Sequence, residues 1–263
     1  MKRCLIVALA LMGTVAATSS LEAKQEKELG AEYIVERALE HNSFGFENAL
    51  ARMRLVITTR RGTERVREIE IRSLSKEGQD KSLVRFHSPA DVAGTGFLVL
   101  GNEGRDDDQY LYLPALGKVK RITGSQKNQR FMGTDLTYAD LESRNLKESV
   151  SKRLPDQKVG GNSTYVIESL PRNAQDSNYG KTISHIHTKS FVPLKVEFFD
   201  RKMRLLKVLS VKKLERRSGK WLVMDSVVKN IQKKTQTRME VQQIDLDIKL
   251  EDKEFTQQAL QEG

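Results

Sequence analysis

Apolar and polar side chains alternate one for one along most of the chain, which is the period of a β-strand with one buried face. In segment 244–250, for example, Ile, Leu, Ile and Leu alternate with Asp, Asp and Lys. The same pattern predicts strands over residues 52–58, 66–74, 82–87, 146–150, 164–170, 181–188, 194–199, 205–214, 221–231 and 239–250. Short turns join many of them, so neighbouring strands run antiparallel. About ten such strands curl into a barrel or half-barrel.

One amphipathic helix is predicted ahead of the strands, over residues 26–41. Leu29, Tyr33, Ile34, Ala38 and Leu39 recur there at helical spacing, and the opposite face is acidic. A helix that binds a membrane surface by itself would need a basic outer face. We therefore interpret this helix as a lid that packs on the sheet.

The N-terminus has the pattern of a secretory signal peptide. Lys2 and Arg3 precede an apolar run over residues 4–17, and small residues follow. Ala17 and Ala23 are both candidate cleavage points, and an uncleaved anchor is disfavoured because the run is short. We expect a signal peptide over 1–23 and a single domain over 24–263, exported to the periplasm. The one cysteine, Cys4, would leave with the signal peptide, which excludes thiol catalysis and cysteine metal sites.

The middle of the chain, from residue 86 to residue 141, departs from simple alternation and holds several motifs. In chain order they are Phe-His-Ser-Pro at 86–89, Val-Ala-Gly-Thr-Gly-Phe-Leu at 92–98, Tyr-Leu-Tyr-Leu-Pro at 110–114, Leu-Gly-Lys-Val-Lys-Arg-Ile at 116–122, Phe-Met-Gly-Thr-Asp at 131–135 and Tyr-Ala-Asp-Leu at 138–141. In this order they closely resemble the family of outer-membrane lipoprotein-sorting-like periplasmic proteins, which is related in fold to the carrier LolA.

The resemblance implies a mainly β fold with a few helices, an α+β fold in which a curved antiparallel half-barrel of the LolA/LolB type is closed by helices over an apolar cavity. LolA-like proteins hold acyl chains in that cavity and carry lipidated cargo across the periplasm. The implied function is a lipid- or lipoprotein-binding carrier without catalytic residues. The alternative is a non-catalytic adaptor or lipid sensor that works with an inner-membrane lipid exporter of the resistance-nodulation-division type.

The candidate ligand-binding residues are the large apolar ones of the middle motifs. They are Leu98, Leu100, Tyr110, Tyr112, Phe131 and Met132. Tyr110 and Tyr112 share one strand face and leucines occupy the other, so this strand is either a central strand buried on both sides or one whose face lines a ligand cavity. Phe131 and Met132 precede a glycine, which fits a flexible apolar flap or a plug at the end of the barrel.

Charge adds a candidate partner surface. The chain has 45 Lys and Arg against 35 Asp and Glu, a net charge of +10. Cations cluster beside the apolar motifs, at Lys118, Lys120, Arg121, Lys127 and Arg130. They are expected to contact anionic headgroups at a membrane surface or an acidic partner, with a strength that falls as salt rises. Nucleic acid is disfavoured as a partner, because export separates the protein from it and no stacking platform is evident.

Signatures of catalysis and of metal binding are weak. Gly-x-Ser-x-Gly, Walker and His-Glu-x-x-His motifs are absent from the sequence, so we expect a non-enzyme without a cofactor. His185 and His187 share a strand face and could ligate a metal together with a third group. Asp106, Asp107 and Asp108 are adjacent and lack the alternate spacing of a calcium loop, which favours an acidic hairpin turn.

Overall fold

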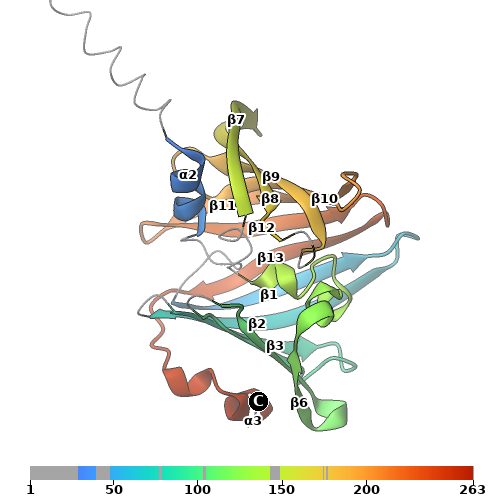
Figure 1. The fold of residues 1–263 in the computed structure, drawn as a ribbon. Helices are drawn as coiled ribbons and strands as arrows, with labels where there is room; N and C mark the ends of the chain where they lie inside the picture. The colour runs from blue at the N-terminus through green and yellow to red at the C-terminus, as the bar shows by residue number, and fades with distance from the viewer. Residues whose placement is uncertain are drawn as a thin grey trace, which may run out of the picture.

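The computed structural model describes residues 29–39, 48–76, 79–102, 105–142, 149–173, 175 and 177–262. These residues form one antiparallel sheet of 13 strands in the order β6-β5-β4-β3-β2-β1-β13-β12-β11-β10-β9-β8-β7 (Figure 1). The terminal strands β6 and β7 do not pair with each other, so the curved sheet stays open as a half-barrel. The expected signal peptide, residues 1–23, with Cys4, lies outside the described residues.

The strands are β1 (Ala49–Thr58), β2 (Glu64–Lys76), β3 (Gln79–Ser88), β4 (Gly96–Leu100), β5 (Asp108–Leu113), β6 (Lys118–Ile122), β7 (Ser149–Val159), β8 (Asn162–Pro171), β9 (Tyr179–His187), β10 (Pro193–Asp200), β11 (Leu205–Arg217), β12 (Lys220–Asn230) and β13 (Thr235–Asp245). The α-helices are α2 (Ala31–Leu39) and α3 (Gln257–Glu262). Short 3-10 helices are η1 (Pro114–Leu116), η2 (Gly124–Asn128), η3 (Phe131–Gly133), η4 (Ala139–Leu141) and η6 (Asp252–Glu254).

The predicted antiparallel half-barrel is confirmed, while several element bounds differ from the prediction. The predicted helix 26–41 is α2, described from Ala31 to Leu39, and residues 26–28 and 40–41 lie outside the described residues. Strand β13 ends at Asp245, not at residue 250, because the chain then leaves β1 and crosses to the other side of the sheet. Strand β7 runs on through Pro155, which an edge strand with a register shift accommodates.

The sheet has an inner face that can be followed from strand to strand by direct pairing. Ile57, Thr237, Val228, Leu209 and Val196 form one continuous row from β1 to β10 on this face. Among the described residues, two separate covers pack on it. Helix α2 packs over β8 and β9, and the segment of short helices between β6 and β7 packs over β1 to β5. Figure 1 shows both covers on the side toward which the sheet curves.

The largest core lies between the inner face of β1 to β5 and the segment of short helices. Alternate residues of these strands, such as Met53, Ile71, Val84 and Phe97, point into it. A smaller core joins α2 to the sheet. It contains Ile34, Val35, Ala38, Tyr165, Ile167 and Ile186. The predicted lid role of the opening helix agrees with this packing.

The outer face of β2 to β6 carries a third core, which the C-terminal segment covers. We call residues 250–262 the strap. Its Phe255 and Leu260 are buried against Leu83 and Leu98. A Cβ atom at Gly96 would lie 2.5 Å from Cδ1 of Leu260, so a larger residue at this position would force the Leu260 side chain to shift. In the described part of the chain, no helix is both long and apolar enough to span a lipid bilayer.

Candidate functional site

The cover over the inner face of β1 to β5 is an apolar plug, which we define as residues 123–142. Phe131 lies at its centre, with its ring 5.0 Å from that of Phe97, 5.5 Å from Tyr138 and 5.9 Å from Phe86. Met132 adopts a left-handed backbone conformation, with φ of 45°, and its carbonyl accepts a hydrogen bond from Arg67. Phe131 thus fills the core, so the structure favours a plug over a flexible flap.

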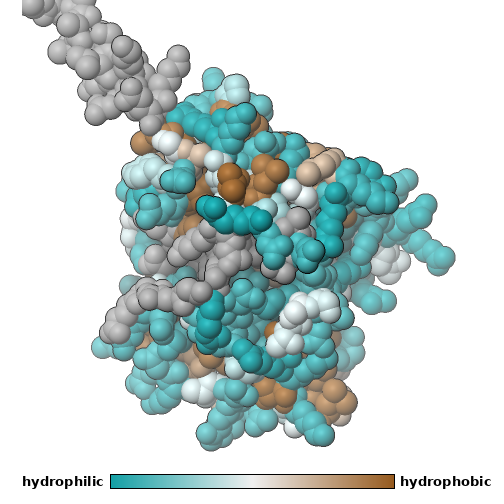
Figure 2. All heavy atoms as spheres, viewed as in Figure 1, coloured by the Kyte–Doolittle hydropathy of each residue, from teal (hydrophilic) through white to brown (hydrophobic). Residues whose placement is uncertain are grey.

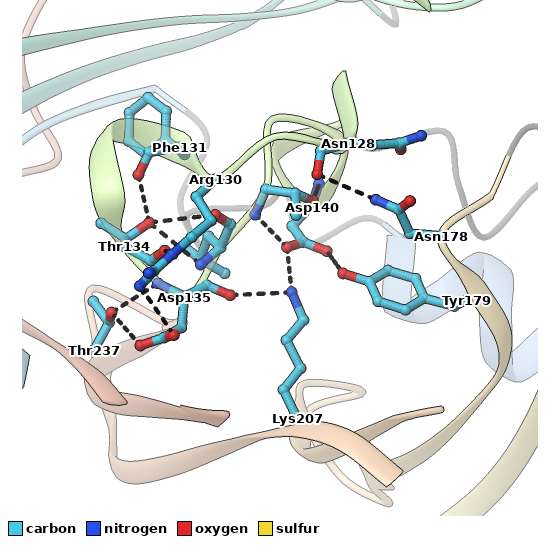
Figure 3. Close-up of polar contacts among 12 residues, drawn as sticks. Asn128, Arg130, Phe131, Thr134, Asp135, Asp140, Asn178, Tyr179, Lys207 and Thr237 are labelled. Atoms are coloured by element: carbon cyan, nitrogen blue, oxygen red, sulfur yellow. Dashed lines mark hydrogen bonds and ion pairs between the residues drawn. The ribbon is translucent and has the colours of Figure 1, made fainter. Parts of the chain in front are cut away.

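Asp135 fixes the plug to strand β13. Its buried carboxylate accepts hydrogen bonds from Thr235 Oγ1 at 2.5 Å and from Thr237 Oγ1 at 3.0 Å. Arg130 of the plug pairs with the same carboxylate at 3.2 Å, as Figure 3 shows. A buried carboxylate is costly unless it is paired and hydrogen-bonded, and these three donors meet that requirement. Moving the plug away from β13 would leave this charge without its partners.

Lys207 of strand β11 holds the other half of the plug. Its side chain is 2% exposed, and its ammonium group lies 2.5 Å from Asp140 and 3.2 Å from the carbonyl of Asp135 (Figure 3). The Tyr179 hydroxyl donates to Asp140 at 2.7 Å. Burial, followed by the charge of Asp140, raises the pKa of Tyr179 well above its usual value, which keeps this donor protonated. The ammonium also lies 4.9 Å from the centre of the Phe198 ring.

A third ion pair joins the two ends of the plug. Lys127 Nζ lies 2.6 Å from Glu142 Oε1, and both side chains are largely buried. Burial raises the pKa of Glu142 to about 7, although the contact with Lys127 opposes this shift. Lys127 also pairs with Asp106 at 3.0 Å. The plug is therefore held together by an ion pair of its own and is attached to the sheet by buried polar contacts.

The six sequence-predicted ligand residues do not share one surface. Phe131 and Met132 belong to the plug on the inner face. Leu98, Leu100, Tyr110 and Tyr112 point to the outer face, where they pack with the strap. Strands β4 and β5 are therefore covered by apolar groups on both sides. In the Tyr-Leu-Tyr-Leu strand, Leu111 is buried on the inner face, and Tyr110 and Tyr112 are half-buried under the strap on the outer face.

A different set of apolar side chains lies on the inner face, on the strands between the plug and α2. It consists of Val196 and Phe198 on β10 and Leu209 and Val211 on β11. All four are half-buried, and none belongs to the three core clusters. We call these four residues the apolar floor. Sequence reasoning missed them, although their alternation with outward residues such as Val208 marked one face of β11.

The predicted basic patch is largely neutralised by carboxylates of the chain itself. Arg121 pairs with Asp108, and Arg130 pairs with Asp135. Lys118 and Lys120 lie on the edge strand β6 and contact no carboxylate among the described residues. Hydrogen bonds from Arg105, Asn102 and Arg121 hold the pKa of Asp108 well below its usual range. The acidic turn thus serves to pair the neighbouring arginines.

The two candidate metal-binding histidines have local partners. His185 Nε2 lies 3.2 Å from Glu197, and His187 Nδ1 lies 2.8 Å from Ser190 Oγ. The described residues contain no group of three or more His, Cys, Asp or Glu side chains that could hold a metal ion. A cavity of about 470 Å³ near Arg105, Asp107 and Lys127 is lined mainly by polar and charged groups, which suits water or ions better than acyl chains.

Comparison with known proteins places the chain in a family. A family model described as "Uncharacterized protein" matches residues 78–262. A solved domain from Vibrio parahaemolyticus, described as an outer membrane lipoprotein-sorting protein, is 32% identical over 88% of this chain and 98% of its own, with a TM-score of 0.81. The chain belongs to the outer-membrane lipoprotein-sorting-like family.

Two further solved structures share the fold of this chain. A DUF1329 family protein from Desulfovibrio piger is 27% identical over 88% of this chain and 99% of its own, with a TM-score of 0.78. A LolA superfamily protein from Nitrosomonas europaea, 19% identical over 88% of this chain and 99% of its own, has a TM-score of 0.68 and shows the fold alone. No curated protein matches the chain significantly. In this member of the lipoprotein-sorting-like family, the motifs at 131–135 and 138–141 belong to the plug and supply Asp135 and Asp140, which bind Thr237 and Lys207 of the sheet.

Proposed function

We propose that the protein is a periplasmic carrier that shields the acyl chains of a lipid or lipidated protein against its inner face and catalyses no reaction. The family membership supports this function. The observation that carries it is the apolar floor, because Val196, Phe198, Leu209 and Val211 present partly exposed apolar surface on one face of two adjacent strands. Large side chains of a stable core would be expected to be fully covered.

The apolar floor suits a ligand that is bound and later released. Each methylene moved from water to an apolar surface contributes about 0.8 kcal/mol, so an acyl chain gains affinity in proportion to the length that lies on the floor. The floor is flanked by Lys207 on the same face, since Lys207 pairs with Phe198 across the strands. Its position between two covers also lets the ligand leave without disrupting the main core under the plug.

Leu209→Gln tests this function, with Val208→Gln as the matched control. The two residues are adjacent on β11, both are half-buried and apolar, and they point to opposite faces. Native mass spectrometry of protein isolated from the periplasm should show a co-purifying species of acyl-chain mass. Retention should fall in Leu209→Gln and persist in Val208→Gln. Transfer of a fluorescent fatty acid between vesicles should respond in the same way.

Two results would contradict the carrier. One is a wild-type protein that never retains an acyl-chain species, and the other is equal retention by both variants. If the protein binds an inner-membrane exporter equally well with and without lipid, the adaptor function is favoured instead. Circular dichroism and urea unfolding of both variants check that any loss of retention does not come from loss of the fold.

A further inference from the structure

Three turns meet at one end of the sheet, and we call them together the basic rim. They are residues 59–63 between β1 and β2, 201–204 between β10 and β11, and 231–234 between β12 and β13. Gln232 Nε2 donates to Asp200 Oδ2 at 3.0 Å and to the carbonyl of Leu205 at 3.2 Å, which joins the second turn to the third. Thr58 pairs with Gln236, so the first turn lies beside the third.

The basic rim concentrates positive charge. Its cations are Arg60, Arg61, Arg201, Lys202, Arg204, Lys233 and Lys234, and no carboxylate lies within the three turns. Two carboxylates flank the turns: Asp200, which Arg204 engages at 2.8 Å, and the exposed Glu64 at the start of β2. Lys202, Lys233 and the two arginines of the first turn are exposed and contact no carboxylate in the described part of the chain. Much of the positive charge behind the chain's net charge of +10 therefore lies at this end of the sheet.

Apolar side chains protrude among these cations. Met203 is 53% exposed and Ile231 is 40% exposed, and they belong to the two adjacent turns that Gln232 joins. Both are among the large hydrophobic residues that the described structure leaves in contact with solvent. Figure 2 shows a mainly hydrophilic surface at the right-hand end of the molecule, where Figure 1 shows these turns. Exposed apolar groups surrounded by unpaired cations are typical of surfaces that bind anionic membranes.

We propose that the basic rim docks the protein on an anionic phospholipid surface. The apolar side chains of Met203 and Ile231 would enter the headgroup region. Lys202, Lys233 and the two arginines of the first turn would pair with lipid phosphates. Side chains that project from the tips of turns can enter a fluid interface without a shaped counterpart, which favours a membrane over a folded acidic protein. This inference rests on the proposed carrier function, since a carrier must reach the membranes that supply and accept its lipid.

Vesicle co-sedimentation tests the inference, with the full chain and vesicles of phosphatidylcholine with or without phosphatidylglycerol. The double variant Lys202→Gln, Lys233→Gln removes two charges from the basic rim. Its partitioning onto phosphatidylglycerol vesicles should fall roughly 30-fold, as expected for two cations near a charged surface. Wild-type binding should also weaken in about 1 M salt, where the Debye length is about 3 Å.

Lys118→Gln, Lys120→Gln is the matched control, because it removes the same charge from the sequence-predicted patch on β6. It should change partitioning less than about twofold if binding is local to the rim. Equal losses in both double variants, or no binding to phosphatidylglycerol vesicles, would overturn the inference. If the protein binds polyglutamate through the basic rim but does not bind vesicles, the inference is overturned and an acidic protein is the favoured partner. Acyl-chain retention by the rim variant, measured separately, distinguishes failure of docking from failure of the carrier function.

Discussion

The plug and the strap cover opposite faces of the same strands, and they are held there by different physical means. The plug packs Phe131 into the inner core and is fixed by buried ionic groups, Lys207 with Asp140 and Asp135 with Thr237. The strap packs Leu260 into the outer core, and its carboxylates pair with the exposed Lys76, the half-buried Lys81 and Arg72.

The difference shows how one sheet can be apolar on both sides without aggregating. Strands buried on both faces need two covers, which parallel sheets usually obtain from helices and this sheet obtains from its own connections. Buried ion pairs depend on exact partners, whereas exposed pairs tolerate their loss. The plug is therefore the cover whose position is most strongly specified, and the strap is the one whose attachment depends on apolar packing and on Arg85, which donates to the carbonyls of Ala259 and Leu260.

Lys207→Met should have the largest effect, because it leaves Asp140 buried without its cation. We expect the free energy of unfolding in urea to fall by about 3–5 kcal/mol. The double variant Lys207→Met, Asp140→Asn should recover part of this loss, since it removes the uncompensated charge. Lys213→Met, which breaks an exposed pair on the same strand, is the control. Equal effects of Lys207→Met and Lys213→Met would contradict the assignment of a buried attachment.

Leu260→Ala should have the next largest effect and should act on the strap. Removal of a fully buried leucine side chain costs about 3 kcal/mol. We expect faster hydrogen exchange and faster proteolysis of the strap and of β4, with β11 to β13 protected as in the wild type. Gln261→Ala, at an exposed neighbour, should leave both unchanged. Uniform loss of protection across the sheet would mean that plug and strap form one cooperative unit.

Glu142→Gln should have the smallest effect, and the effect should depend on pH. The pKa of Glu142 is raised from 4.5 to about 7, so the folded protein binds this proton more tightly than the unfolded chain does. The wild-type free energy of unfolding therefore loses this contribution as the pH rises from about 4.5 to about 7. Relative to wild type, Glu142→Gln should gain about 2 kcal/mol over this interval in urea unfolding.

Asp252→Asn in the strap is the matched control for this pH dependence. Hydrogen bonds from Lys81 and Lys76 lower the pKa of Asp252 below 3.8. Its contribution to stability is therefore present above that pH and is lost only in stronger acid. Asp252→Asn should show no pH dependence relative to wild type between about pH 5 and about pH 8. A slope equal to that of Glu142→Gln would mean that the two carboxylates do not differ in burial as the structure indicates.

The fold was largely predictable because alternation is a local property of the sequence. Residues such as Ile69 and Ile71 mark one face of a strand whatever lies beyond it. The candidate site was less predictable, because the alternation of Tyr110 and Leu111 shows that both faces are apolar without showing which cover each one meets. The ion pairs of the basic patch were also not predictable from its cations alone. Arg121 pairs with Asp108 on the neighbouring strand β5 and Arg130 pairs with Asp135 within the plug, and the apolar–polar pattern of the sequence specifies neither contact.

The amino-acid sequence by itself determined the antiparallel half-barrel, the family and the apolar character of the middle motifs. Periodicity and motif order are properties of the linear sequence and do not depend on tertiary contacts. Only the tertiary structure decided that Phe131 and Tyr112 lie on opposite faces, that Lys207 is buried against Asp140, and that three distant turns gather their cations at one end. These features depend on contacts between residues that are far apart in sequence, and such contacts are set by the sheet order and the strand register.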